Sequence, residues 1–172
     1  MQGLNPDQNR NVPPLCYDQV VALANEFPEY TFTINGGFAT YEEIEEILKP
    51  ENRIQGVMVG RLAMNNPWYL NDVDRRFYGQ RNPGYSRREI LKIWADYVEN
   101  QDQKYPGRSW QFFHKPILNL FIGEKNCRNY RRILSDSKIN KKFGSYSQLI
   151  EHLIEDLEKS NKEALDQKPP QK

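Results

Sequence analysis

The spacing of apolar residues changes partway along this chain. Up to about residue 79, short apolar runs that end in glycine alternate with stretches in which apolar residues recur every three or four positions, the spacing typical of helices. From residue 86 onward only the helical spacing continues. The pattern therefore predicts mixed strand and helix at residues 1–80, a helical domain at 86–160 and a disordered tail at 161–172.

The first part is predicted to hold two strands, each followed by a glycine turn. Thr40 and Glu43 have the spacing of a capping box, in which two side chains satisfy free N–H groups at the start of a helix. The apolar stripe that follows them fits one face of that helix. The expected elements are a helix over residues 17–26, a strand over 30–34, a helix after Thr40, and a second strand within Gly56–Arg61 that runs into Gly60.

The helical domain is predicted from two further N-terminal caps. Ser86 is followed three residues later by Glu89, and Ser145 by Gln148. Another helix is expected over 110–121, where Pro116 must start or kink it. Apolar residues at helical spacing follow both caps: Ile90, Leu91, Ile93, Trp94, Tyr97 and Val98 after the first, and Leu149, Ile150, Leu153, Ile154 and Leu157 after the second.

Two parallel strands are too few for an independent sheet, because their unpaired edges and apolar faces would stay exposed. We therefore expect the first part to be the last segment of a larger barrel. The predicted fold class is α/β, namely the C-terminal portion of a (β/α)8 TIM barrel followed by an all-α helical domain.

Glycines at the ends of both predicted strands indicate an anion site. Without a Cβ, glycine lets backbone N–H groups approach an anion closely. In (β/α)8 barrels the loops after the last two strands commonly bind phosphate. The alternative is that these glycines only form a tight turn and end a strand. The candidate residues are Asn35, Gly36 and Gly37 after the first strand, and Gly60 and Arg61 after the second.

Charge is distributed unevenly, although the formal net charge is only +1. Cations neutralise phosphates and aromatic faces stack on bases, so a basic segment with aromatic residues fits a polyanion. The alternative is a solvated helix surface above core aromatics. Residues 104–142 hold ten Lys and Arg against two acids, and the aromatic residues Trp110, Phe112, Phe113, Tyr130 and Phe143 lie within this segment or directly after it.

Other features narrow the class of protein. No run approaches the roughly 20 apolar residues of a membrane helix, and the N-terminus lacks a basic-then-apolar signal, so we expect a cytoplasmic protein with no membrane partner. The two cysteines, Cys16 and Cys127, lie far apart and no histidines cluster. We therefore expect neither a disulfide framework nor a metal site.

Many short motifs together resemble the tRNA-dihydrouridine synthases. They occur in the order and spacing of that family over roughly residues 1–135, and they are most similar to the branch acting at positions 20 and 20a of the tRNA D-loop. The motifs are Gly3-Leu4-Asn5-Pro6, Asn9-Arg10, Pro13-Pro14-Leu15, Phe27-Pro28, Ile34-Asn35-Gly36-Gly37, Gly56-Val57-Met58-Val59-Gly60-Arg61, Asn66-Pro67-Trp68, Val73-Asp74-Arg75, and Lys115 to Gly123 followed by Arg128, Tyr130, Arg131 and Arg132.

The resemblance implies a flavin-dependent reduction of tRNA. In the family, FMN reduced by NADPH delivers hydride to the uracil double bond, and a cysteine acts as general acid. The positions that hold the FMN phosphate map onto Asn35, Gly36, Gly37, Gly60 and Arg61, and those that contact tRNA map onto Asp7, Arg10, Arg128 and Arg131.

The sequence also departs from the family pattern. The family's catalytic cysteine and the residues that hold the flavin ring align before Met1, and neither Cys16 nor Cys127 replaces that acid. At Asp7 many relatives have a cation. We therefore expect no catalytic residue here, and we expect the C-terminal part of a synthase that is inactive alone and monomeric at full length.

Two other hypotheses stay open. In one, the chain is a non-catalytic tRNA-binding module in which the helical domain binds and the barrel remnant serves as a platform. In the other, it is a piece of a different flavin barrel that acts on small molecules, since such phosphate sites recur across barrels.

Overall fold

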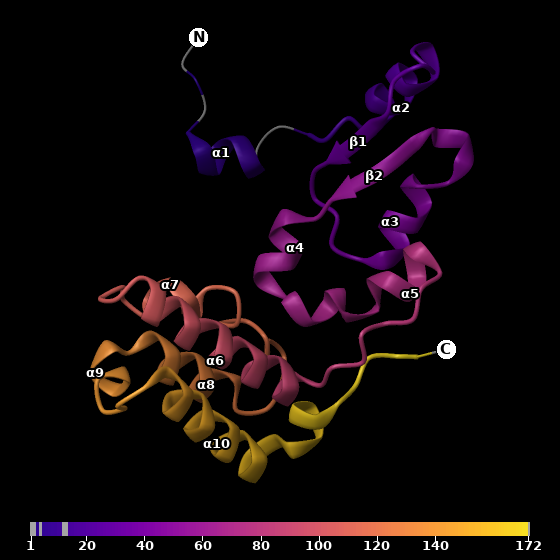
Figure 1. Ribbon diagram of the computed structural model, residues 1–172. Coiled ribbons are helices and arrows are strands. Elements are labelled where there is room, and N and C mark those ends of the chain that lie inside the picture. The colour runs from indigo at the N-terminus through magenta and orange to yellow at the C-terminus, as the bar shows by residue number, and fades with distance from the viewer. Residues whose placement is uncertain (1–2, 4, 12–13, 172) are drawn as a thin grey trace. The chain divides into compact units, whose positions relative to one another are not determined.

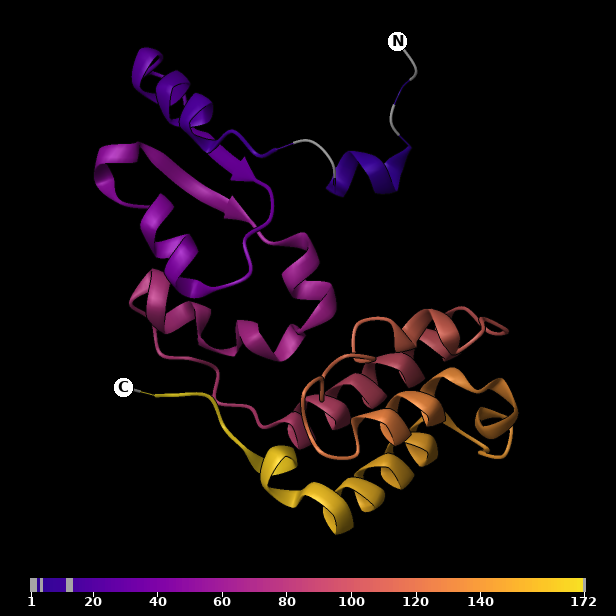
Figure 2. The same ribbon diagram turned by 180° about the vertical axis from the view of Figure 1, so that it is seen from behind.

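The computed structural model describes residue 3, residues 5–11 and residues 14–171 (Figures 1 and 2). The chain divides into two compact units, Met1–Arg61 and Leu62–Lys172, and each is described by itself. This division falls earlier than the predicted boundary at residues 80–86. The protein is a helix-rich mixture of α and β structure.

The first unit is built around a pair of parallel strands, β1 (Phe32–Asn35) and β2 (Ile54–Met58). Asn35 pairs with Met58 at the carboxyl ends of the two strands. The connection between the strands runs through α3 (Tyr41–Ile47), as a parallel pair requires. The other elements are α1 (Pro6–Asn11), α2 (Tyr17–Glu26), the 3-10 turn η1 (Pro50–Asn52) and α4 (Gly60–Asn65), which begins at the end of this unit.

Local sequence signals account for the helices of the first unit. The prediction of a helix over residues 17–26 is confirmed by α2. The capping box is also confirmed, since the Glu43 N–H donates to Thr40 Oγ1 at 3.2 Å and the Thr40 N–H donates to Glu43 Oε2 at 3.1 Å. The buried apolar residues of this unit are Ala24, Ile34, Phe38, Tyr41, Ile44 and Ile54.

In the described residues of the second unit, 62–171, helices and 3-10 turns alternate with loops, and no strand is present. Two long helices, α6 and α10, run side by side in both views (Figures 1 and 2). The elements are η2 (Pro67–Asp72), α5 (Val73–Tyr78), α6 (Arg87–Lys104), α7 (Gln111–His114), α8 (Cys127–Ser135), α9 (Ser137–Asn140) and α10 (Tyr146–Asp166).

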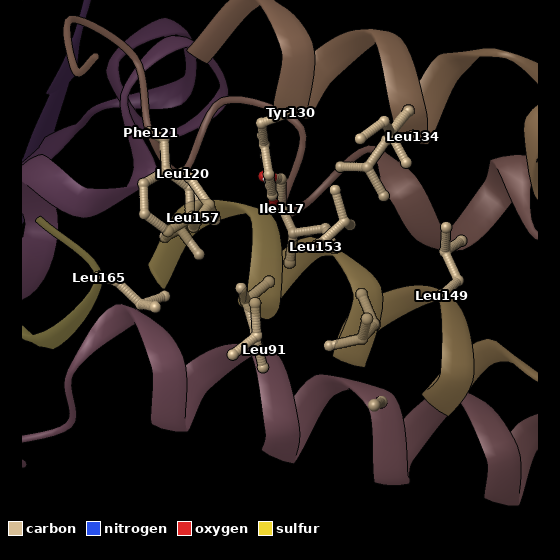
Figure 3. Close-up of a cluster of buried hydrophobic side chains, with 14 of the residues drawn as sticks. Leu91, Ile117, Leu120, Phe121, Tyr130, Leu134, Leu149, Leu153, Leu157 and Leu165 are labelled. Carbon is tan, nitrogen blue, oxygen red and sulfur yellow. The ribbon is translucent and has the colours of Figure 1, made fainter. Parts of the chain in front are cut away.

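The predicted caps and the core face of α10 are confirmed. Ser86 and Glu89 form a reciprocal capping box, and Ser145 accepts from the Gln148 N–H. All five apolar residues predicted for the last helix are buried, and they pack against α6, α8 and the 117–121 segment (Figure 3). On α6 the apolar face is narrower than predicted, because Ile93 and Tyr97 are exposed.

Three predictions for the second unit need correction. The helix expected over 110–121 ends at His114, after which the chain continues in tight turns through Pro116. Helix α8 was not predicted, because its apolar positions are few and stand among arginines. The disordered tail expected from residue 161 is instead packed as far as residue 171, with Leu165 fully buried and the Asn82 side chain bonded to the Pro170 carbonyl.

A buried histidine makes the stability of the second unit depend on pH. His114 stacks on Tyr146 with ring centroids 5.7 Å apart, and neither of its ring nitrogens has a hydrogen-bond partner among the described residues. Burial lowers the pKa of His114 from 6.5 to about 4, with a weaker opposing contribution from the Leu134 backbone. The unfolded chain therefore binds a proton between these pH values while the folded chain does not.

We expect the free energy of unfolding to fall by about 2 kcal/mol as the pH drops from about 7 to 4, beyond the change shown by a His114→Phe variant. The contribution of neutral His114 to the free energy of unfolding is fully retained above pH 6.5. It declines as the pH falls toward the pKa of about 4 that His114 has in the folded chain. The measurement is urea unfolding of both proteins at several pH values, with His152→Gln as the control because His152 is exposed. An equal pH dependence in the wild type and His114→Phe would contradict this expectation.

Candidate functional site

The glycine turn after β1 has a backbone that other residues rarely adopt. Gly36 and Gly37 have φ angles of 139° and 67°. A Cβ at either position would lie 2.9 Å from the Leu15 side chain, which lies against the turn. The Tyr17 hydroxyl donates to the Gly36 carbonyl at 2.5 Å, and this bond also holds the turn. The positive φ angles therefore favour glycine at both positions.

The second predicted phosphate-binding segment lies at the same edge of the strand pair. Because Asn35 and Met58 are paired at the carboxyl ends of β1 and β2, the residues that follow each strand leave the sheet side by side. Asn35 leads into the glycine turn, and Gly60 begins α4 with Arg61 in its first turn. The structure thus brings both segments to one edge, as the sequence predicted.

The donors at this edge suit an anion. Asn35 and Arg61 are exposed, and Arg61 has no ion-pair partner among the residues that the structure describes. A glycine turn with positive φ angles, an exposed amide side chain and a guanidinium with no ion-pair partner among the described residues together suit a phosphate group. We call Asn35, Gly36, Gly37, Gly60 and Arg61 the strand-end site.

A second charged feature lies on α8. Arg128, Arg131 and Arg132 are all exposed on one side of this helix, and we call them the α8 arginine surface. Arg132 donates to the Asn129 side chain at 2.7 Å, whereas Arg128 and Arg131 have no ion-pair partner in the described part of the chain. Like charges three and four residues apart repel each other, so a bound polyanion would stabilise this surface.

The opposite side of α8 anchors it to the core of the second unit. Tyr130, Ile133 and Leu134 are buried, and the Tyr130 hydroxyl donates to the Ile117 carbonyl at 2.8 Å. Asn126 and Asn129 both donate to Asp156 on α10, at 2.7 and 2.9 Å. Helix α8 therefore holds its arginines on a rigid support.

The two acids of the basic segment do not neutralise its surface. Glu124 pairs with the buried Arg87 at 3.2 Å, and Asp136 accepts from the Lys138 and Ile139 N–H groups as the N-cap of α9. Both carboxylates therefore bind partners within the second unit. Among the residues that the structure describes, the cations of this segment have no ion-pair partner, which favours the polyanion interpretation over an ordinary solvated surface.

The aromatic part of that interpretation is only partly supported. Phe113 and Tyr130 belong to the core, whereas Phe112 is 70% exposed. Trp110 and Phe143 are half-buried and line a cavity of about 250 Å³. The sequence did not reveal this cavity, because its walls come from segments about 30 residues apart.

The remaining predicted contacts lie in the first unit. Asp7 occupies the first turn of α1 and is exposed. The backbone of Arg10 belongs to the same helix, but its side chain lies outside the described part of the structure. The four predicted tRNA contacts therefore fall in two pairs, Asp7 with Arg10 on α1 of the first unit and Arg128 with Arg131 on α8 of the second.

The predicted absences concern cysteines, metals and membrane segments. Cys16 and Cys127 are free thiols. In the described residues, no group of three or more His, Cys, Asp or Glu side chains is arranged to hold a metal ion. Within the same residues, every helix is too short or too polar to cross a membrane.

Comparison with known proteins gives one consistent family. Residues 3–158 match the family described as dihydrouridine synthase. Curated proteins named tRNA-dihydrouridine(20/20a) synthase are 37% identical over 81% of this chain in Synechocystis sp., 34% over 90% in Haemophilus ducreyi and 33% over 90% in Escherichia coli. The chain spans 40 to 46% of the length of these three relatives.

Proposed function

Because the chain belongs to the dihydrouridine synthase family, we propose that it is the C-terminal part of a flavin-dependent synthase that reduces uridine in the D-loop of tRNA. The relatives named for positions 20 and 20a support these positions as the target. The observation that carries the proposal is the strand-end site, where two segments that suit phosphate meet at the carboxyl edge of parallel strands.

In this proposal β1 and β2 are the last strands of a (β/α)8 barrel, whose phosphate site commonly follows those strands. Asn35, Gly36 and Gly37 would hold the FMN phosphate from one side, and Gly60 and Arg61 from the other. FMN reduced by NADPH supplies the hydride for the uracil double bond. The residues of this chain bind and orient one end of the cofactor.

The second unit, in this proposal, is the tRNA-binding helical domain. Arg128 and Arg131 would contact backbone phosphates, since exposed arginines without counter-ions bind phosphate and release condensed cations. Arg10 and Asp7 would face the tRNA from α1. The rigid mounting of α8 supports this role, because an ordered surface loses less entropy on binding.

A chimeric enzyme tests the proposal. The matching part of the Synechocystis synthase is replaced by this chain, and bound FMN and dihydrouridine in tRNA are measured. We expect the chimera to bind FMN and to form dihydrouridine. We expect Arg61→Ala to weaken FMN binding about tenfold, because one charge-assisted contact is lost. Lys49→Ala is the matched control, since Lys49 already pairs with Glu46 at 2.6 Å. Unchanged FMN binding in Arg61→Ala would reject the strand-end site.

A polypeptide of these 172 residues alone is expected to bind tRNA but to form no dihydrouridine with FMN and NADPH. The strand-end site holds only one end of the cofactor, and neither Cys16 nor Cys127 matches the family's proton donor. The measurement is mass spectrometry of nucleosides from treated tRNA. Dihydrouridine formed by this polypeptide alone would contradict the proposed division of roles.

The second candidate is a non-catalytic tRNA-binding module. It is favoured by one observation, namely that the helical unit has its own large core and carries the α8 arginine surface. A folded chimera that binds FMN and tRNA but forms no dihydrouridine would support this candidate over the synthase.

A further inference from the structure

The cavity of about 250 Å³ lies at one end of the helical unit. Its walls come from the segment that leads into α7 and from α9 with the residues just after it. Both views place α7 and α9 at the same end of this unit (Figures 1 and 2). The cavity is separate from the strand-end site and from the α8 arginine surface, and neither proposed role uses it.

We propose that this cavity binds a single nucleotide, with the base between Trp110 and Phe143 and the phosphate at Arg108 and Lys141. The four residues all line the cavity. The proposal deepens the proposed RNA-binding role and rests on it only for the source of the nucleotide. That source is either an unpaired residue of an RNA strand or a free mononucleotide.

The charge of the cavity selects an anion. Arg108 and Lys141 are exposed at its wall, and every other lining residue is neutral. The Arg108 guanidinium lies 4.7 Å from the centre of the Tyr105 ring, a contact that orients the side chain and leaves its charge unpaired. Lys141 likewise has no ion-pair partner within the described ranges. A single phosphate therefore finds two cations and no competing carboxylate.

The aromatic walls select a planar group. Trp110 and Phe143 both line the cavity and are both half-buried, and two aromatic residues at one cavity suit a planar ligand. Base stacking on aromatic side chains contributes about 1–3 kcal/mol per base and accepts any base. The volume lies below the roughly 300–1,000 Å³ of pockets for drug-sized ligands, which limits the occupant to one nucleotide.

The cavity walls are held in place before any ligand binds. The Trp110 ring meets the buried Tyr146 ring at 87° with centroids 5.5 Å apart. Phe143 packs on His152 at 5.2 Å, and Asn140 is buried and donates to the Ile133 carbonyl at 2.6 Å. A preformed site loses little conformational entropy on binding, so one nucleotide is sufficient to occupy it.

Nuclear magnetic resonance of the full chain tests this inference. ¹⁵N-labelled protein is titrated with uridine monophosphate, with a single-stranded uridine trinucleotide, with uridine and with inorganic phosphate. We expect saturable shifts of the Trp110 indole and of the Ser137 and Asn140 amides with both nucleotides. Lys141→Gln is expected to weaken the binding of both nucleotides about tenfold. The matched control is Lys159→Gln, because Lys159 is an exposed cation on α10.

The outcomes separate the sources and the alternatives. Tighter binding of the trinucleotide assigns the cavity to an RNA strand, and tighter binding of the monophosphate assigns it to a free nucleotide. No local shift with any ligand, or equal shifts with inorganic phosphate alone, overturns the inference. If the cavity takes no nucleotide while tRNA still binds through the α8 arginine surface, this inference fails and the proposed function stands. If nucleotides shift the cavity signals but the chain does not bind tRNA, this inference stands and the proposed tRNA-binding role fails.

Discussion

Replacing Arg87 with methionine is expected to lower the free energy of unfolding of the helical unit by about 3–5 kcal/mol. The Arg87 side chain is only 3% exposed. Its guanidinium lies 4.2 Å from the centre of the Trp68 ring and 5.4 Å from that of Phe121. Burial lowers the pKa of Arg87, and Glu124 opposes that change, so the charge is retained by its contacts.

The large effect follows from the acceptors that Arg87 satisfies. Its Nε donates to the Leu120 carbonyl and its Nη1 to the Ala164 carbonyl, both at 2.9 Å, and Nη1 also donates to Gln167. Methionine fills part of the volume but donates to none of them. Two backbone carbonyls and the Glu124 carboxylate would then lose their partner in a poorly solvated place.

The neighbouring residue provides a matched control. Arg88 bonds Asp166 at 2.6 Å and Glu158 at 3.3 Å, but it lies near the surface, so Arg88→Met is expected to cost at most about 1 kcal/mol. The measurement is urea unfolding followed by tryptophan fluorescence, which reports this unit because all three tryptophans lie within residues 62–172. Equal losses in the free energy of unfolding in the two variants would show that the contribution of Arg87 to stability does not come from its burial.

Replacing both Arg128 and Arg131 with alanine is expected to weaken tRNA binding on the order of 100-fold. Each arginine is exposed and has no ion-pair partner among the described residues, so each is available for one charge-assisted contact of roughly 1.5–3 kcal/mol. The helix should stay folded, since its core side is formed by the buried Tyr130, Ile133 and Leu134, whereas both arginine side chains are exposed.

The salt dependence distinguishes phosphate contacts from a general loss of charge. The slope of log affinity against log salt should become shallower by about 1 to 2 in the double variant, and the loss should be similar for many tRNAs. The control is Lys159→Ala with Lys162→Ala on α10, which removes the same net charge from another helix. An equal loss of tRNA affinity in this control would show that α8 does not contact tRNA phosphates. An unchanged salt slope in the arginine variant would show the same.

The sequence predicted well the features that depend on near neighbours in the chain. The caps at Thr40, Ser86 and Ser145 were identified because a cap is complete within four residues. The glycine turns at Gly36 and Gly37 were identified because the need for positive φ is local. The strand-end site followed from them, since two parallel strands place their carboxyl ends at one edge.

The sequence predicted poorly the features that depend on distant contacts. Helix α8 has three buried residues among its arginines, which is a weak pattern until α10 supplies Asp156 and the rest of the core supplies its apolar surface. The segment after His114 has apolar residues at helical spacing, yet it forms tight turns. Among the aromatics of the basic segment, no local signal separates the exposed Phe112 from the buried Phe113.

By itself, the sequence determined the capped helix starts, the glycine turns and the family, because each of these rests on short-range geometry or on motifs in a fixed order. Only the tertiary structure decided which charges are buried and which are free. Arg87 and Arg88 are identical neighbours, but one lies inside the core and the other at the surface. Burial depends on what the rest of the chain places around a residue, and residues 120, 124 and 164 come to Arg87 only in the folded unit.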